Sequence, residues 1–197
     1  MIHRRHLLLA TAAAPLAAAF APAVRAAAVI DLAGGQPRAA DIVRALRPQR
    51  AAGAAPGTHG LARTRSLSVA GAPATNSKPV SFDQITFDYN SAKLRPESRR
   101  TLAEIGQALA SPELAALSFQ VEGHTDAKGG FAYNIRLSRK RAASVCEHLR
   151  TQHGIAGERL VAVGKGPTEL LDPERPESAA NRRVALVAFQ GNAGHSG

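Results

Sequence analysis

The feature that most constrains the fold of this chain is a change of apolar periodicity that repeats from Val80 onward. Short stretches in which every second residue is apolar are typical of half-buried strands. They alternate with longer stretches in which apolar residues recur every three or four positions, which is the pattern of an amphipathic helix. Because helices that alternate with strands pack against a sheet, residues 80–191 predict an α/β sandwich with the order β-α-β-α-β-β. We expect a mixed sheet with both helices on one face.

Six elements make up this predicted domain. Strands are predicted at 82–89, 117–123, 159–166 and 182–189, and helices within 91–111 and from Phe131 or Asn134 to His153. In the first strand, Ile85 and Phe87 share one face. Pro96 suits the first turn of the first helix, where no backbone N–H is needed. Gly154 suits the end of the second helix, because glycine adopts the left-handed conformation common there.

Residues 1–26 have the composition of a signal peptide, with a basic start and an alanine-rich apolar stretch. We expect cleavage after about Ala26, and the pair Arg4-Arg5 also fits a twin-arginine export signal. Pro15 and the many alanines argue against a retained membrane helix. Cys146 is the only cysteine, so we expect neither an internal disulfide nor acylation at a lipoprotein-type cleavage site.

Residues 27–79 are predicted to form a basic linker rich in Ala, Gly and Pro, with a possible short helix within 37–48. Up to residue 79 the chain carries 10 Lys and Arg against 2 Asp and Glu, whereas residues 80–197 carry 15 against 13. The net charge of +10 therefore lies mainly outside the predicted domain, which argues against a nucleic-acid-binding domain. Residues 192–197 are expected to form a disordered tail.

A polar stripe borders the apolar face of the second predicted helix. Asn134, Ser138 and Arg141 fall on this stripe, where a partly desolvated charge needs a partner. The periodicity alone does not distinguish Arg141 from Arg139, which falls at the opposite edge of the apolar face. Asp126 precedes the helix in a glycine-bearing turn, where a carboxylate either caps the turn or binds a ligand.

Five segments carry a resemblance to a known family. They are ITFDYNSAKL (85–94), VEGHTDAKG (121–129), YNIRLSRKRAASV (133–145), RLVAVGKG (159–166) and NRRVAL (181–186). In this order and spacing they resemble the OmpA-like peptidoglycan-binding domain, which also occurs in Pal-type lipoproteins and MotB-type stator proteins. The resemblance implies that the domain grips the diaminopimelate of the peptidoglycan stem peptide. By motif position, Asp126 takes the ammonium of diaminopimelate and Arg141 takes its carboxylate.

Further pocket residues follow from the same resemblance. The residues expected around the ligand, besides Asp126 and Arg141, are Asn134 and Thr125 as contacts and Phe87, Asn90 and Leu137 as walls. Arg182 and Arg183 resemble a family pair, which we interpret as fold or rim contacts.

The implied function is that of an exported, non-enzymatic module that binds peptidoglycan noncovalently, in the periplasm or at the outer membrane. No cofactor and no metal is expected, and further partners would be outer-membrane or other envelope proteins rather than nucleic acid. One alternative is an envelope-surface or partner-binding protein that uses the basic linker, with the OmpA-like domain as a scaffold only.

Two catalytic alternatives use the same short stretch. His124, Asp126 and Ser138 invite comparison with a catalytic triad, and Glu122, His124 and Asp126 alternate along a strand end as metal ligands can. We disfavour both, because Ser138 lies inside the apolar face of its helix and no H-x-E or C-x-x-C element is present.

Overall fold

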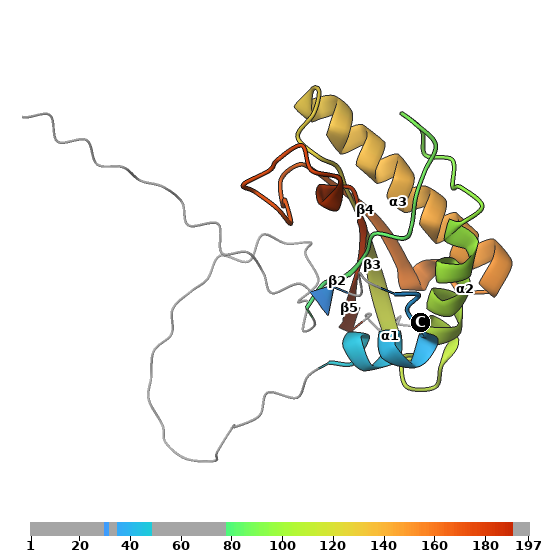
Figure 1. Cartoon of the computed structure of the whole chain (residues 1–197). Coiled ribbons are helices and arrows are strands. Elements are labelled where there is room, and N and C mark those ends of the chain that lie inside the picture. Colours follow the sequence, from blue (N-terminus) through green and yellow to red (C-terminus); the bar gives the residue numbers. More distant parts are fainter. Residues whose placement is uncertain (1–29, 32–34, 49–77, 191–197) are drawn as a thin grey trace, which may run out of the picture.

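The computed structural model describes residues 30–31, 35–48 and 78–190 (Figure 1). The predicted signal peptide, the predicted tail and residues 49–77 of the predicted linker lie outside these ranges. The described residues form a mixed sheet packed against helices, as the apolar periodicity predicted. Among them, no helix combines the length and the apolarity needed to cross a membrane.

The sheet has five strands, of which the first is only two residues long. The strands are β1 (Ile30–Asp31), β2 (Val80–Phe82), β3 (Leu117–His124), β4 (Leu160–Gly166) and β5 (Val184–Gln190). Their order in the sheet is β1-β2-β5-β3-β4. β3 pairs with β4 in parallel and with β5 in antiparallel orientation, and β2 pairs antiparallel with β5. From β2 onward the elements follow the order β-α-β-α-β-β, which confirms the predicted topology.

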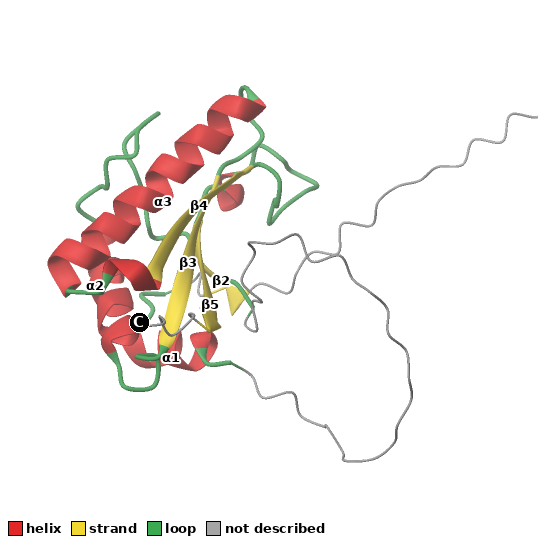
Figure 2. Ribbon diagram, turned by 180° about the vertical axis from the view of Figure 1, so that it is seen from behind, coloured by secondary structure: helices red, strands yellow, loops and turns green. Residues whose placement is uncertain are grey.

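Three α-helices pack on one side of this sheet (Figure 2). They are α1 (Ala39–Leu46), α2 (Ser98–Ala110) and α3 (Phe131–His153). α3 lies along β3 and β4, and α2 contacts both α3 and α1. Gly164 permits the close approach of α3, because a Cβ there would lie 2.6 Å from the backbone nitrogen of Arg139. Gly154 ends α3 with a φ of 65°, as predicted.

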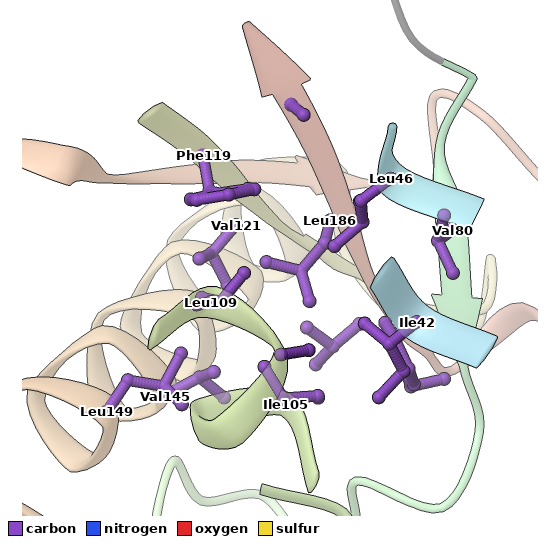
Figure 3. Packing of buried hydrophobic residues seen from close by; sticks show 14 of the residues in the cluster. Ile42, Leu46, Val80, Ile105, Leu109, Phe119, Val121, Val145, Leu149 and Leu186 are labelled. Atoms are coloured by element: carbon purple, nitrogen blue, oxygen red, sulfur yellow. The ribbon is translucent and has the colours of Figure 1, made fainter. Parts of the chain in front are cut away.

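One aliphatic core joins the sheet to all three helices (Figure 3). Its fully buried side chains come from every layer and include Ile42, Leu46, Val80, Leu102, Ile105, Leu109, Phe119, Val121, Val145, Leu149 and Leu186. With few aromatic residues available, branched aliphatic side chains fill the space between the layers.

Helix α1 changes the predicted extent of the linker. The possible short helix within 37–48 is present, but it packs into the core, where Ile42 and Leu46 have no exposed surface. These two residues are one turn apart and therefore share the face that meets α2. The backbone N–H of Ala39 also donates to Glu104 Oε2 of α2 at 2.8 Å. The fold thus includes residues N-terminal to the predicted boundary at residue 80.

The first strand is shorter and earlier than predicted. β2 ends at Phe82, and only an isolated bridge between Phe87 and Leu94 follows it. The partner strand β5 begins at Val184, which pairs with Phe82, so later residues have no strand on which to extend the ladder. Ile85 is nevertheless buried. The alternation in 82–89 therefore predicted the burial of Ile85 correctly, but it was wrong in predicting a strand that continues to residue 89.

The start of α2 ties down the segment that follows β2. Ser98 Oγ accepts a hydrogen bond from the backbone N–H of Thr86 at 2.8 Å and donates to the carbonyl of the same residue at 3.0 Å. Pro96 lies in the turn before α2 rather than in its first turn, where it was predicted. This segment forms one wall of the cavity described below.

Candidate functional site

Asp126 lies in the turn between β3 and α3, and the backbone on both sides of it is fixed. The N–H of Thr125 donates to the carbonyl of Gly166 at 3.0 Å, and the N–H of Ala127 donates to the carbonyl of Pro176 at 2.9 Å. The carboxylate is only 13% exposed, and its Oδ2 accepts a hydrogen bond from Arg182 Nη1 at 2.8 Å. The sequence motif thus places a largely buried carboxylate at a well-defined position beside the sheet.

Arg141 projects from α3 toward the segment that follows β2. Its guanidinium carbon lies 5.1 Å from the centre of the Phe87 ring, and its Nε donates to the carbonyl of Ser91 at 2.9 Å. Within the described residues no carboxylate lies within ion-pair distance of this guanidinium. Burial lowers the pKa of Arg141, and the more distant charge of Asp126 opposes that effect. A positive charge held by neutral groups in a half-buried place can accept an anion.

Asn134 fixes the turn that carries Asp126. The residue is 4% exposed, and its Nδ2 donates to the carbonyl of Lys128 at 3.0 Å and, at 3.5 Å, to that of Asp126. The amide donors of Asn134 therefore hold the turn that carries Asp126 against the first turn of α3. Thr125 is also buried, and its Oγ1 has no hydrogen-bond partner within the described residues.

A cavity of about 540 Å³ opens beside these residues. Its lining residues come from the segment after β2, the end of β3, α3 and the approach to β5: Asp83, Ile85, Thr86, Phe87, Arg95, His124, Arg141, Ala179, Ala180, Arg182 and Arg183. Of the predicted site residues, Arg141 and Phe87 line the cavity. The others are not among its lining residues: Asp126, Thr125, Asn134, Asn90 and Leu137. Asp126 adjoins the cavity through its ion pair with Arg182, which does line it. Asn90 instead accepts a hydrogen bond from the hydroxyl of Tyr133, beside the start of α3.

The sequence did not indicate Arg95 or Asp83 as pocket residues, and it indicated Arg182 only as a fold or rim contact. The hydrogen bond between Arg182 and Asp126 joins residues that are 56 positions apart in the sequence, and Arg95 comes from the turn before α2. Neither placement produces a periodic pattern in the sequence, because both depend on how the segment after β2 and the loop before β5 approach the sheet. The resemblance of Arg182 to a family pair was the only available signal.

His124 and Glu122 form a buried polar pair at the end of β3, with His124 Nε2 3.5 Å from Glu122 Oε2. Burial lowers the pKa of His124, although the neighbouring carboxylate of Glu122 opposes this effect. Burial alone would raise the pKa of Glu122, but His124, Lys165 and Gln120 together outweigh it and lower that pKa. Lys165 Nζ lies 3.4 Å from Glu122 Oε1.

The geometry does not assemble the residues of the catalytic alternatives. Ser138 is fully buried, and its Oγ donates to the carbonyl of Ile135 at 2.9 Å and accepts from the N–H of Gly166 at 3.0 Å. Its hydroxyl is therefore engaged in structural hydrogen bonds between α3 and β4. Asp126 pairs with Arg182 rather than with His124. In the part of the chain that the structure describes, no group of three His, Cys, Asp or Glu side chains could hold a metal ion.

Comparison with known proteins gives matches over the same region. Residues 86–183 match the OmpA family. The probable lipoprotein YiaD of Escherichia coli is 36% identical over 107 residues, which are 53% of this chain and 48% of that protein. The outer-membrane lipoprotein YfiB of Pseudomonas aeruginosa is 33% identical over 106 residues, which are 53% of this chain and 61% of that protein. The chain thus spans less than two thirds of the length of either relative.

Among solved structures, the peptidoglycan-associated lipoprotein of Burkholderia pseudomallei is 27% identical and covers 53% of this chain and 87% of its own, with a TM-score of 0.45. The family match spans the segment after β2, the turn of Asp126, all of α3 and the approach to β5. It therefore contains every residue that the five sequence motifs singled out for the site. Residues 86–183 form a domain of the OmpA family, as those motifs predicted.

Proposed function

We propose that this protein binds peptidoglycan noncovalently through the diaminopimelate of the stem peptide, and that it thereby anchors or organises the cell envelope. It acts in this proposal as an exported, non-enzymatic module in the periplasm or at the outer membrane. Two relatives that it matches over this domain are named lipoproteins, one of them of the outer membrane, which supports an envelope location.

The observation that carries the proposal is the placement of Asp126 and Arg141 at one site: Asp126 contacts Arg182, and Arg182 lines the same cavity as Arg141. Asp126 is a carboxylate on a fixed turn, and Arg141 is a guanidinium held by neutral groups. The free end of diaminopimelate carries an ammonium and a carboxylate on one carbon. A fixed carboxylate and a guanidinium fork can bind these two groups at once with charge-assisted hydrogen bonds.

The role of Asn134 in this proposal is to position Asp126. Its amide donors hold the backbone of the turn, so it sets the location of the carboxylate instead of supplying donors to the ligand. Thr125 Oγ1 is buried next to Asp126 and can complete the contacts to a bound ammonium.

The test compares binding of the purified full chain to two kinds of sacculi, one with diaminopimelate and one with lysine at the third stem position. Lysine lacks the carboxylate that Arg141 is proposed to hold. We expect strong binding to the diaminopimelate sacculi only. Asp126→Asn and Arg141→Gln should each cost about 2–5 kcal/mol of binding free energy, since the remaining charge loses its partner.

Arg136→Gln is the matched control, because Arg136 is an exposed arginine of the same helix and does not line the cavity. Its binding should equal that of the unaltered chain. Equal binding to both kinds of sacculi, or indifference to both site substitutions, would mean that the domain keeps the fold without this recognition.

A further inference from the structure

The cavity beside Asp126 carries more positive charge than a zwitterion can balance. Four guanidinium groups line it, against one lining carboxylate among the described residues, Asp83. Two of the four, Arg182 and Arg95, pair with carboxylates beside the cavity, Asp126 and Glu97, so a net positive charge remains. The free end of diaminopimelate brings one positive and one negative group, so its binding leaves the net charge of the site unchanged. Guanidinium groups gathered around a partly closed cavity attract a further anion.

Under the proposed function, diaminopimelate binding changes the surroundings of Arg182. Its present partner is Asp126 Oδ2 at 2.8 Å, which is the carboxylate proposed to take the ligand ammonium. The ammonium must therefore share or displace Arg182. With a side chain that is 48% exposed and lines the cavity, Arg182 has room to turn toward a bound molecule.

Arg95 faces the same cavity from the turn before α2. Its Nε lies 3.0 Å from Glu97 Oε1, but both side chains are more than half exposed. Exposed ion pairs of this kind contribute little to stability. Arg95 can therefore exchange Glu97 for an anion of the ligand at small cost.

His124 is a second, independent indication of a ligand in this cavity. Its side chain is 1% exposed and lines the cavity, and neither ring nitrogen has a hydrogen-bond partner within the described residues. Nε2 is the nitrogen near Glu122, at 3.5 Å. Buried polar atoms in proteins normally have a partner. A polar group of a bound molecule can supply the missing hydrogen-bond partner of Nδ1.

The stem peptide offers a second anion one residue away from diaminopimelate, namely the α-carboxylate of the γ-linked glutamate that precedes it. We propose that Arg182, together with Arg95, binds this second carboxylate. The inference rests on the proposed function, since it places diaminopimelate between Asp126 and Arg141. Its consequence is selectivity, because the protein distinguishes stem peptides whose glutamate α-carboxyl is free from those in which it is amidated.

The test measures calorimetric binding of the full chain to four synthetic stem tetrapeptides. One is unmodified, and the others are amidated at a single carboxyl: the glutamate α-carboxyl, the side-chain-end carboxyl of diaminopimelate, or the C-terminus. Amidation of the glutamate should weaken binding by about tenfold or more, the value of a lost charge-assisted hydrogen bond. C-terminal amidation should have little effect.

Arg182→Gln and Arg95→Gln should each bind the unmodified peptide more weakly and should lose most of the discrimination against the glutamate amide. Arg100→Gln, an exposed arginine of α2 outside the cavity, should retain it in full. Since Arg182 also contacts Asp126, the Arg95 variant and the peptide amides test the inference even if Arg182→Gln disturbs the turn.

The outcomes separate this inference from the function on which it rests. If none of the peptides binds, or if amidation of diaminopimelate has no effect, the proposed function fails. If amidation of diaminopimelate weakens binding while the glutamate amide binds as well as the free peptide, the proposed function stands and this inference is wrong. A loss on C-terminal amidation alone would assign the second anion to the chain end and would likewise overturn it.

Discussion

Helix α1 gives the sharpest test of where this fold begins, because it lies outside the region that matches the OmpA family. Leu46 has no exposed surface and packs in the core. Leu46→Ala therefore removes three buried carbon atoms together with their contacts and leaves a cavity. Substitutions of this type lower the free energy of unfolding by about 2–5 kcal/mol. α1 has eight residues and no side-chain hydrogen bond at its N-cap, so packing must supply most of its stability.

The assay is urea unfolding of the full chain followed by circular dichroism. Arg44→Ala is the control, because Arg44 is exposed on the same helix, and it should change the free energy of unfolding by less than about 0.5 kcal/mol. If α1 detaches before the rest unfolds, Leu46→Ala should also lower the denaturant dependence, since less surface is then exposed in the main transition. A midpoint and slope equal to those of the control would refute the packing of α1 on α2.

Four further predictions concern single residues. Gly164→Ala should lower the free energy of unfolding by about 1–3 kcal/mol, because its Cβ would lie 2.6 Å from the backbone of α3, and chemical denaturation measures this. The pKa of His124 in the folded protein lies below its ordinary 6.5, so the unfolded chain binds the proton more readily. Stability should therefore fall as pH drops below 6.5, and His124→Gln should flatten that dependence in thermal melts. Burial raises the pKa of the Cys146 thiol to about 11, so alkylation at pH 8 should be much slower in the native protein than in urea. Arg141→Lys keeps the charge but loses the fork and the stacking on Phe87, so it should bind sacculi nearly as weakly as Arg141→Gln.

The unit formed by β3, its turn and α3 could be predicted closely from the sequence. The apolar period changes from two to about 3.6 across Asp126, and Gly154 marks the end of the helix. The choice between Arg139 and Arg141 could not be made from that period, since both lie at edges of the apolar face. Only the tertiary fold shows that the edge with Arg141 meets Phe87. From the sequence, Arg141 could be chosen over Arg139 only by its position in the family motif.

Helix α1 and the end of β2 were harder to predict, for different physical reasons. α1 is short and alanine-rich, between prolines, so its composition resembles a linker although Ile42 and Leu46 are fully buried. The end of β2 is set by its partner, because β5 begins at Val184 and offers no earlier residue for pairing. A side-chain pattern reports burial, whereas the length of a strand depends on a neighbour that is distant in the sequence.

The two charges of the site are held by different kinds of structure, and this difference bears on how its selectivity can vary. The turn of Asp126 is fixed by backbone hydrogen bonds to the loops near Gly166 and Pro176 and by the amide of Asn134. Arg141 is positioned instead by the segment after β2, through Phe87 and the carbonyl of Ser91. That segment has little regular structure and also supplies Asp83 and Arg95 to the cavity. Under the proposed function, changes in that segment can therefore alter which anions the cavity accepts, while the carboxylate proposed to bind the ammonium stays in place.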